Sequence, residues 1–188
     1  VVEGYVVKGA QALIALPFGI GGILVGGLYA FTVVAGLHHM YNMIEAQMVS
    51  LAVPKNTWMP IATAANVAQG AAALAVSFKT KNKKIKSMAA PASMSAFLGI
   101  TEPAIFGVNV RFMKPFIAGC IGGAAGGFVA AISGAYATAY GITGLFGFLI
   151  TTKTLVAYAL TMLVAFLVAF VVSFVIYKDA EEEAPSKE

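Results

Sequence analysis

Charged residues are scarce in this sequence, and their scarcity excludes an ordinary soluble domain. Asp, Glu, Lys and Arg make up 11% of the 188 residues, whereas soluble domains carry about a quarter. Hydrophobic residues reach 60% of the chain, and its mean hydropathy is +0.86. We therefore expect an integral membrane protein.

Cysteine is nearly absent as well. Cys120 is the single cysteine, so no internal disulfide can form, and its surroundings lack metal-ligand spacing. We expect it to be a small packing residue. No secretory signal peptide is visible, because Glu3 and Lys8 stand where a basic cap and cleavage site belong, and Val1 looks like a fragment boundary.

Runs without any Asp, Glu, Lys or Arg fill most of the chain. They cover residues 9–44, 56–78, 87–101, 115–152 and 154–177. A helix needs about 20 apolar residues to span a bilayer, so several of these runs are long enough to do so. The sequence therefore predicts an all-α membrane fold.

Two of these runs are too long for one straight span. Residues 9–44 and 115–152 would each form a helix much longer than the hydrocarbon core of about 30 Å. We expect breaks at LPFGIGG (residues 16–22) and at GAYATAYGITG (residues 134–144). Broken backbone survives at membrane depth only inside protein or beside a cavity. These breaks therefore predict re-entrant helical hairpins around an internal site.

The net charge of +4 comes mainly from the segment FKTKNKKIKS, residues 78–87. Basic loops beside membrane helices favour the cytoplasmic side, so this segment predicts topology and gives no reason to expect a nucleic-acid partner. The segment most simply forms a solvated loop, although an acidic or phosphate-rich partner could dock there. Residues 179–188, DAEEEAPSKE, have the composition of a charged cytoplasmic tail or linker.

A short list of polar residues interrupts the apolar runs and defines the candidate site. They are His38, His39, Asn42, Glu45, Asn66, Gln69, Thr101, Glu102, Asn109 and Arg111. On one helix, His38, Asn42 and Glu45 share a face, which favours His38 over His39 as the cavity-facing histidine. A purely structural pair of Glu45 with a histidine stays open. A zinc site of Glu45 with both histidines is disfavoured, because adjacent histidines on a helix diverge.

Glu102 is followed by Pro103 within the stretch GITEPAIFG. Proline disfavours the helical region for the residue before it, so we expect the carboxylate to lie at a bend beside Thr101. A carboxylate at membrane depth is costly and indicates a functional site. It could bind a hydroxyl-rich ligand, act as a general base, relay protons, or simply pair with Arg111 or Lys114.

Two stretches resemble a known family. GITEPAIFGVNVRFMKPF, residues 99–116, resembles the GITEP signature of the glucose superfamily of phosphotransferase-system sugar permeases, in their membrane domain EIIC. GLHHMYNMIEAQ, residues 36–47, with TWMPIATAANVAQGAAALAV, residues 57–76, resembles the sucrose and related disaccharide branch. The resemblance runs over nearly all of residues 1–177.

The resemblance implies a homodimeric domain of the bacterial cytoplasmic (inner) membrane that binds a disaccharide and releases it as a sugar phosphate. A phosphocysteine on the soluble EIIB domain would donate the phosphoryl group, and no cofactor is implied. Glu102 would bind the sugar beside the phosphorylated hydroxyl, Thr101 would line the pocket, and the family histidine corresponds to His38 or His39. The other candidate sugar contacts in these motifs are Asn42, Asn109 and Arg111.

The family's EIIC domains are about twice as long as this chain. Residues 1–178 therefore resemble their C-terminal, transport part, without most of the dimer scaffold, and this part alone is expected to be inactive. Cys120 lacks the surroundings of a phosphocysteine. Two alternatives stay open: a proton-coupled sugar symporter with Glu102 as proton carrier, and a structural subunit or non-functional fragment.

Overall fold

The computed structural model describes residues 9, 11–50, 53–141 and 143–179, and within them it contains helices and one isolated antiparallel bridge, Asn56 with Ala137. The helical elements, in chain order, are η1 (Pro17–Gly19), α2 (Ile20–Val34), η2 (Leu37–Met40), α3 (Tyr41–Val49), α4 (Trp58–Lys79), α5 (Lys83–Phe97), α6 (Glu102–Ala104), the π-helix η3 (Ile105–Asn109), α7 (Val110–Phe112), α8 (Lys114–Ser133), η4 (Gly144–Leu149), η5 (Thr152–Thr154) and α9 (Leu155–Ile176).

Four segments are long and apolar enough to cross a membrane. They are Pro17–Val34, Trp58–Lys79, Lys114–Ser133 and Thr152–Ile176. The run at residues 87–101 is not among them, because it lies mostly in the shorter helix α5. The predicted all-α membrane class is thus confirmed.

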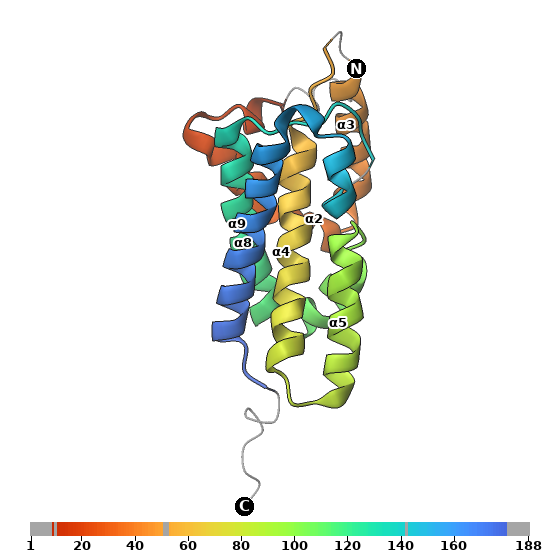
Figure 1. Ribbon diagram of the computed structural model, residues 1–188, viewed down its shortest axis with the longest axis vertical. Coiled ribbons are helices and arrows are strands. Elements are labelled where there is room, and N and C mark those ends of the chain that lie inside the picture. The colour runs from red at the N-terminus through yellow and green to blue at the C-terminus, as the bar shows by residue number, and fades with distance from the viewer. Residues whose placement is uncertain (1–8, 10, 51–52, 142, 180–188) are drawn as a thin grey trace, which may run out of the picture.

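Helix α4 runs through the middle of the bundle, with α2, α5, α8 and α9 packed around it (Figure 1). Of the apolar 18-residue stretch of α4 that could span a membrane, 89% is buried inside the protein. Its sequence explains this position, since alanine and glycine dominate it and let neighbouring backbones approach closely. The central helix therefore fixes where the surrounding polar side chains meet.

The glycine pairs of α2 and α8 make the closest helix contact. A Cβ atom on Gly22 would collide with the carbonyl oxygen of Gly127, and one on Gly26 would collide with that of Gly123. Small residues at four-residue spacing are the usual device for such approach in lipid. These glycines therefore let α2 and α8 pack backbone against backbone.

Both predicted breaks in the long runs are present. Phe18 and Gly19 have φ values of 59° and 73°, which separate α2 from the chain before it. Helix α8 ends at Gly134, whose φ is 66°, and residues 135–143 then form no helix in their described part. Left-handed backbone of this kind ends a helix, and glycine adopts it at little cost.

Two re-entrant segments meet at their tips. Helix α5 is capped by Asn82, whose side-chain oxygen accepts hydrogen bonds from Lys84 N and Ile85 N, and it ends before the turn at Gly99, where φ is 100°. The chain then returns along α5 through α6, η3 and α7. The second segment enters through η4, whose Gly144 lies against the Phe97 carbonyl. Of the two predicted breaks, the one at residues 134–144 therefore leads into a re-entrant segment at the interior site, and the other re-entrant segment is formed by α5 to α7.

The lysine-rich loop and the end of α9 lie together at the end of the molecule opposite the start of α4 (Figure 1). Asp179 is the only residue of the expected tail, 179–188, that the structure describes, and it is buried. Its carboxylate accepts a hydrogen bond from Thr80 Oγ1 at 2.9 Å and another from Lys81 N at 2.6 Å. Asp179 therefore fastens the loop to the end of α9.

Replacing Asp179 with alanine should destabilise the protein. Both donors lose a charged acceptor in a buried setting, and such a loss costs about 1–3 kcal/mol. Thermal unfolding of the detergent-solubilised full-length protein would measure the effect. The matched control is Lys178→Ala, which changes an exposed neighbour; equal melting temperatures for the two variants would contradict the fastening role.

Candidate functional site

A small polar cavity of about 170 Å³ lies where α2, η2, α3 and α4 approach the two re-entrant tips. Its walls combine carboxylates, amides, hydroxyls, one imidazole and two glycines of the turns. The lining residues are Tyr29, Val33, His38, Asn42, Glu45, Asn66, Gly99, Thr101, Glu102, Gly141 and Thr143. This cavity gathers most of the polar residues that the sequence places inside apolar runs.

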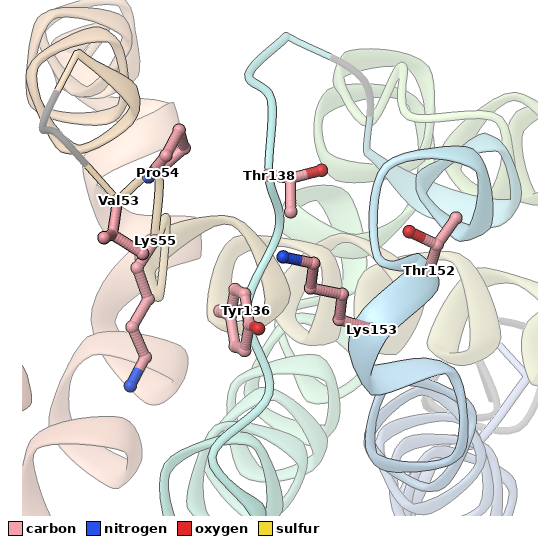
Figure 2. A pocket seen from close by; sticks show the side chains of 7 residues that line it. All are labelled: Val53, Pro54, Lys55, Tyr136, Thr138, Thr152 and Lys153. Atoms are coloured by element: carbon pink, nitrogen blue, oxygen red, sulfur yellow. The ribbon is translucent and has the colours of Figure 1, made fainter.

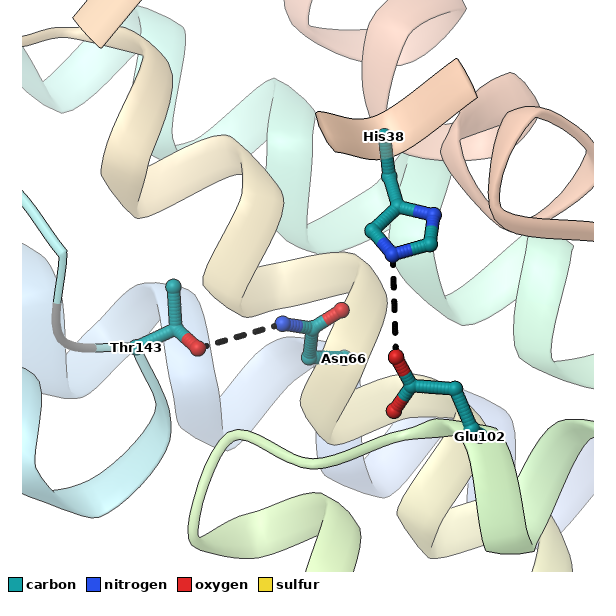
Figure 3. Close-up of polar contacts among 4 residues, drawn as sticks. All are labelled: His38, Asn66, Glu102 and Thr143. Atoms are coloured by element: carbon teal, nitrogen blue, oxygen red, sulfur yellow. Dashed lines mark hydrogen bonds and ion pairs between the residues drawn. The ribbon is translucent and has the colours of Figure 1, made fainter. Parts of the chain in front are cut away.

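His38 and Glu102 face each other across the cavity (Figure 3). The distance between His38 Nε2 and Glu102 Oε1 is 3.6 Å, longer than a strong hydrogen bond, and 47% of the Glu102 side chain is exposed. None of the described residues hydrogen-bonds the buried Nδ1 of His38. The pair therefore keeps hydrogen-bonding capacity on both side chains.

The neighbouring histidine has a different environment. His39 stacks on His38 with ring centroids 4.0 Å apart, but it is exposed and does not line the cavity. The structure therefore places His38, rather than His39, on the cavity wall, on the side favoured by helix geometry.

The short helix η2 starts after Gly36, whose φ of 74° ends α2, and the chain continues directly into α3. This path brings His38, Asn42 and Glu45 to one cavity. The carboxylate of Glu45 accepts a hydrogen bond from Asn56 Nδ2 at 2.7 Å, so it fixes α3 against the start of α4. Burial raises the pKa of the Glu45 carboxyl, and the bond from Asn56 lowers it in part.

Glu102 is the first residue of α6 instead of lying at the bend itself. The bend falls at Gly99, and Thr101 O then accepts the hydrogen bond of Ile105 N at 2.9 Å. Pro103 sits in the first helical turn, where its missing N–H has no partner to lose. The expectation of a non-helical Glu102 was wrong for this reason, whereas its position beside Thr101 on a turn is as expected.

Besides His39, two of the expected sugar contacts, Asn109 and Arg111, lie outside the cavity. Asn109 Nδ2 donates to Gln69 Oε1 at 2.7 Å and to Gln69 O at 2.9 Å, so it joins α4 to η3 in the core. Arg111 is exposed and lies over the ring of Phe112, 5.6 Å from its centroid. The alternative partners of Glu102, Arg111 and Lys114, do not line the cavity either.

Several lining residues were not expected from the sequence: Tyr29, Gly141 and Thr143. Asn66 of α4 donates to Thr143 Oγ1 at 3.3 Å, which ties the second tip to the central helix (Figure 3). The sequence does carry a signal for Thr143, because the tripeptide Gly-Ile-Thr occurs at residues 99–101 and again at 141–143. Gly99 and Gly141 have similar φ values of 100° and 105°.

The arrangement suits a neutral ligand with many hydroxyl groups. Amides and hydroxyls can both donate and accept, and a carboxylate beside an imidazole can take a proton from a bound hydroxyl. In the described ranges, no three His, Cys, Asp or Glu side chains gather as a metal site. Membrane-length helices around a polar cavity closed by broken helices are typical of membrane transport proteins.

Comparison with known proteins identifies the family. The family model for the phosphotransferase system, EIIC, matches residues 1–123. A sucrose-specific EIIBC component of the phosphotransferase system from Salmonella typhimurium is 49% identical over 149 residues, which cover 78% of this chain and 33% of that protein. The chain therefore belongs to the EIIC family of the phosphotransferase system, whose members lie in the bacterial inner membrane.

Other relatives point to the same branch. The sucrose-specific EIIBC component of Bacillus subtilis is 46% identical over 155 residues, covering 78% of this chain and 33% of the relative. A trehalose-specific EIIBC component of the same organism is 36% identical over 146 residues, with 77% and 31% covered. The chain spans about a third of the length of these relatives. No solved structure matches the chain.

Proposed function

We propose that this chain is the sugar-binding part of a phosphotransferase-system permease that takes up sucrose, or a closely related disaccharide, and phosphorylates it. The observation that carries the proposal is the His38–Glu102 pair on a polar cavity. It occurs in a chain that is 46–49% identical to proteins named as sucrose-specific EIIBC components. The rest of the permease is needed for transport.

Sugar recognition would rest on the side chains around that pair. Asn42, Asn66, Thr101 and Thr143 offer donors and acceptors to sugar hydroxyls from three sides of the cavity. The cavity of about 170 Å³ is smaller than ordinary ligand pockets of roughly 300 Å³ and more. One sugar ring would therefore occupy it, while the second ring lies toward the opening or requires the tips to separate.

Glu102 would act as the general base of phosphoryl transfer. A sugar hydroxyl attacks the phosphorus of the EIIB phosphocysteine, an O–P bond forms, the S–P bond breaks, and the hydroxyl proton passes to the Glu102 carboxylate. His38 Nε2 would orient that carboxylate. The thiolate that leaves belongs to the cysteine of EIIB. Cys120 of this chain would not serve as the phosphate donor, since it lies partly buried in α8 with its Sγ 3.8 Å from Gln69 Nε2.

The partners follow from this scheme. A phosphorylated EIIB domain must reach the cavity, and in the relatives named EIIBC components it belongs to the same polypeptide. A homodimer would form through parts of the permease other than residues 1–178. The lipid bilayer would surround the bundle of membrane-length helices, with α4 inside it.

The deciding experiment is phosphoryl transfer from purified phospho-EIIB to sugars by the full-length permease. We expect sucrose phosphate to form faster than trehalose phosphate, with little product from glucose. Unmodified sugar accumulating in vesicles, with uptake that collapses when a protonophore is added, would contradict phosphorylation. Failure to bind any sugar would contradict a transport role altogether.

The two histidines should differ sharply in this assay. We expect His38→Gln to lower the rate of sugar phosphorylation by about 10²-fold, because an orienting partner of the general base is lost. His39→Gln changes the exposed neighbouring ring. This variant should lower the phosphorylation rate by less than about threefold, because exposed residues away from a site usually have small effects. Equal losses would show that the cavity arrangement is not the functional one.

A further inference from the structure

A second cavity lies away from the candidate site. It measures about 390 Å³ and is lined by Val53, Pro54, Lys55, Tyr136, Thr138, Thr152 and Lys153 (Figure 2). Its walls come from the loop before α4, the extended residues after α8 and the short helix η5 before α9. None of these residues belongs to the His38–Glu102 cavity.

The position of this cavity along the membrane normal follows from the helices that start beside it. Helices α4 and α9 have 22 residues each, which at 1.5 Å per residue spans about 33 Å, the thickness of a hydrocarbon core. Lys55 lies just before α4 and Lys153 just before α9, and both helices start at the same end of the bundle (Figure 1). The two lysines therefore lie at the level of lipid headgroups.

No carboxylate of the described residues compensates the positive charge of this cavity. Lys153 extends toward Tyr136 and Thr138, and the Lys55 amino group lies 5.5 Å from the centre of the Tyr136 ring (Figure 2). Only three carboxylate side chains occur in the described ranges, Glu45, Glu102 and Asp179, and none of them lines the cavity. Within those ranges neither lysine forms an ion pair. An anion is the complementary ligand.

An apolar groove begins a short distance below along α9. It measures about 340 Å³ and is lined by Val67, Phe97, Leu145, Phe148, Ala159, Met162, Leu163 and Phe166. Thr152 of the basic cavity precedes Ala159 by two helical turns, so roughly 10 Å separate the two levels. Neighbouring exposed residues of α9, Leu160 and Leu167, are aliphatic. The groove therefore opens toward hydrocarbon.

We propose that these two hollows form one binding site for an anionic phospholipid, with its phosphate in the basic cavity, where the side chains of Lys55 and Lys153 can reach it, and an acyl chain in the groove beside α9. The basic cavity at headgroup level and the dry groove beneath it match the two parts of such a lipid. Each lysine near a phosphate strengthens binding about fivefold. The site stands on the side of the membrane opposite the lysine-rich loop, and it is independent of the proposed sugar chemistry.

Native mass spectrometry of the full-length protein, purified from phosphatidylglycerol-containing membranes, tests the headgroup part. The double variant Lys55→Gln with Lys153→Gln should retain the lipid about 25-fold more weakly, from fivefold per lysine. The matched control is Lys83→Gln with Lys84→Gln, two exposed lysines that line no cavity described here, and it should keep the lipid. Equal losses in both double variants would overturn the proposal.

A second pair of variants tests the acyl chain. Ala159→Trp fills the groove, whereas Leu160→Trp adds the same side chain at an adjacent exposed position. Only the first should release phosphatidylglycerol. Phosphatidylcholine, which has no net charge, should bind the parent protein more weakly than phosphatidylglycerol does. Displacement of the lipid by millimolar inorganic phosphate, or equal retention by both tryptophan variants, would show that the cavity holds a free anion and would refute a lipid site.

Discussion

Glu102→Gln in the full-length permease should lower the rate of sugar phosphorylation by about 10²–10⁴-fold, the range that general bases contribute. Glutamine keeps the size of the side chain and its hydrogen-bonding reach, but it cannot accept the hydroxyl proton. Phosphoryl transfer from phospho-EIIB to sucrose measures the effect, while membrane insertion and melting temperature should stay at parent values.

The matched variant is Glu102→Asp, which keeps the charge and moves it by one methylene. It should regain part of the lost rate, because aspartate still offers a carboxylate that can accept the hydroxyl proton. Full activity is not expected, since the carboxylate moves away from His38 Nε2, which lies 3.6 Å from Glu102 in the parent. Sugar binding in the absence of phospho-EIIB separates two roles, because a base that is used only in the reaction leaves the dissociation constant nearly unchanged. Normal phosphorylation by Glu102→Gln would refute its assignment as base.

Gly144→Ala should be nearly as damaging, although Gly144 carries no chemistry. Its φ is 70°, which costs a residue with a Cβ atom about 1–2 kcal/mol, and that atom would collide with the Phe97 carbonyl oxygen and lie 3.0 Å from Gly99 N. The two tips must then separate. A displacement of about 1 Å at a reacting geometry can cost 10²-fold, so we expect a loss of that order in phosphorylation.

Gly134→Ala is the control for this variant. Gly134 has a similar φ of 66°, but nothing lies within 4 Å of an added Cβ atom. It pays the same backbone cost without moving the tips, so its melting temperature should fall while sugar phosphorylation stays within about threefold of the parent. If both variants lost activity equally, backbone strain and not contact between the tips would be the cause.

The breaks in the long apolar runs could be predicted because geometry requires them. A straight helix of that length does not fit a bilayer, and glycine and proline mark where it ends. The grouping of His38 with Asn42 could also be predicted, since helical periodicity places them on one face. Both lie on the cavity wall.

Helical periodicity does not say what a helix face contacts, so the partners of the polar residues could not be predicted from the sequence. Asn109 is as polar as Asn42, yet it pairs with Gln69 across a packed interface. Thr143 lies far from Asn66 in sequence, and only the folding of the second tip onto α4 brings the two together. Such contacts depend on how the helices cross, which a single sequence does not encode locally.

The close approach of Gly99 to Thr143 has one more consequence. Where Gly99 meets Thr143, the cavity wall beside Glu102 is a contact between two separate chain reversals, and we call this contact the seam. It is not the side of one continuous helix. The hydrogen bond from Asn66 to Thr143, 3.3 Å long, connects the second reversal to the central helix at the cavity. Parting the seam would enlarge the chamber for a second sugar ring while α2, α4, α8 and α9 keep their glycine-mediated contacts, so accommodation of a larger guest need not disturb the membrane-spanning core.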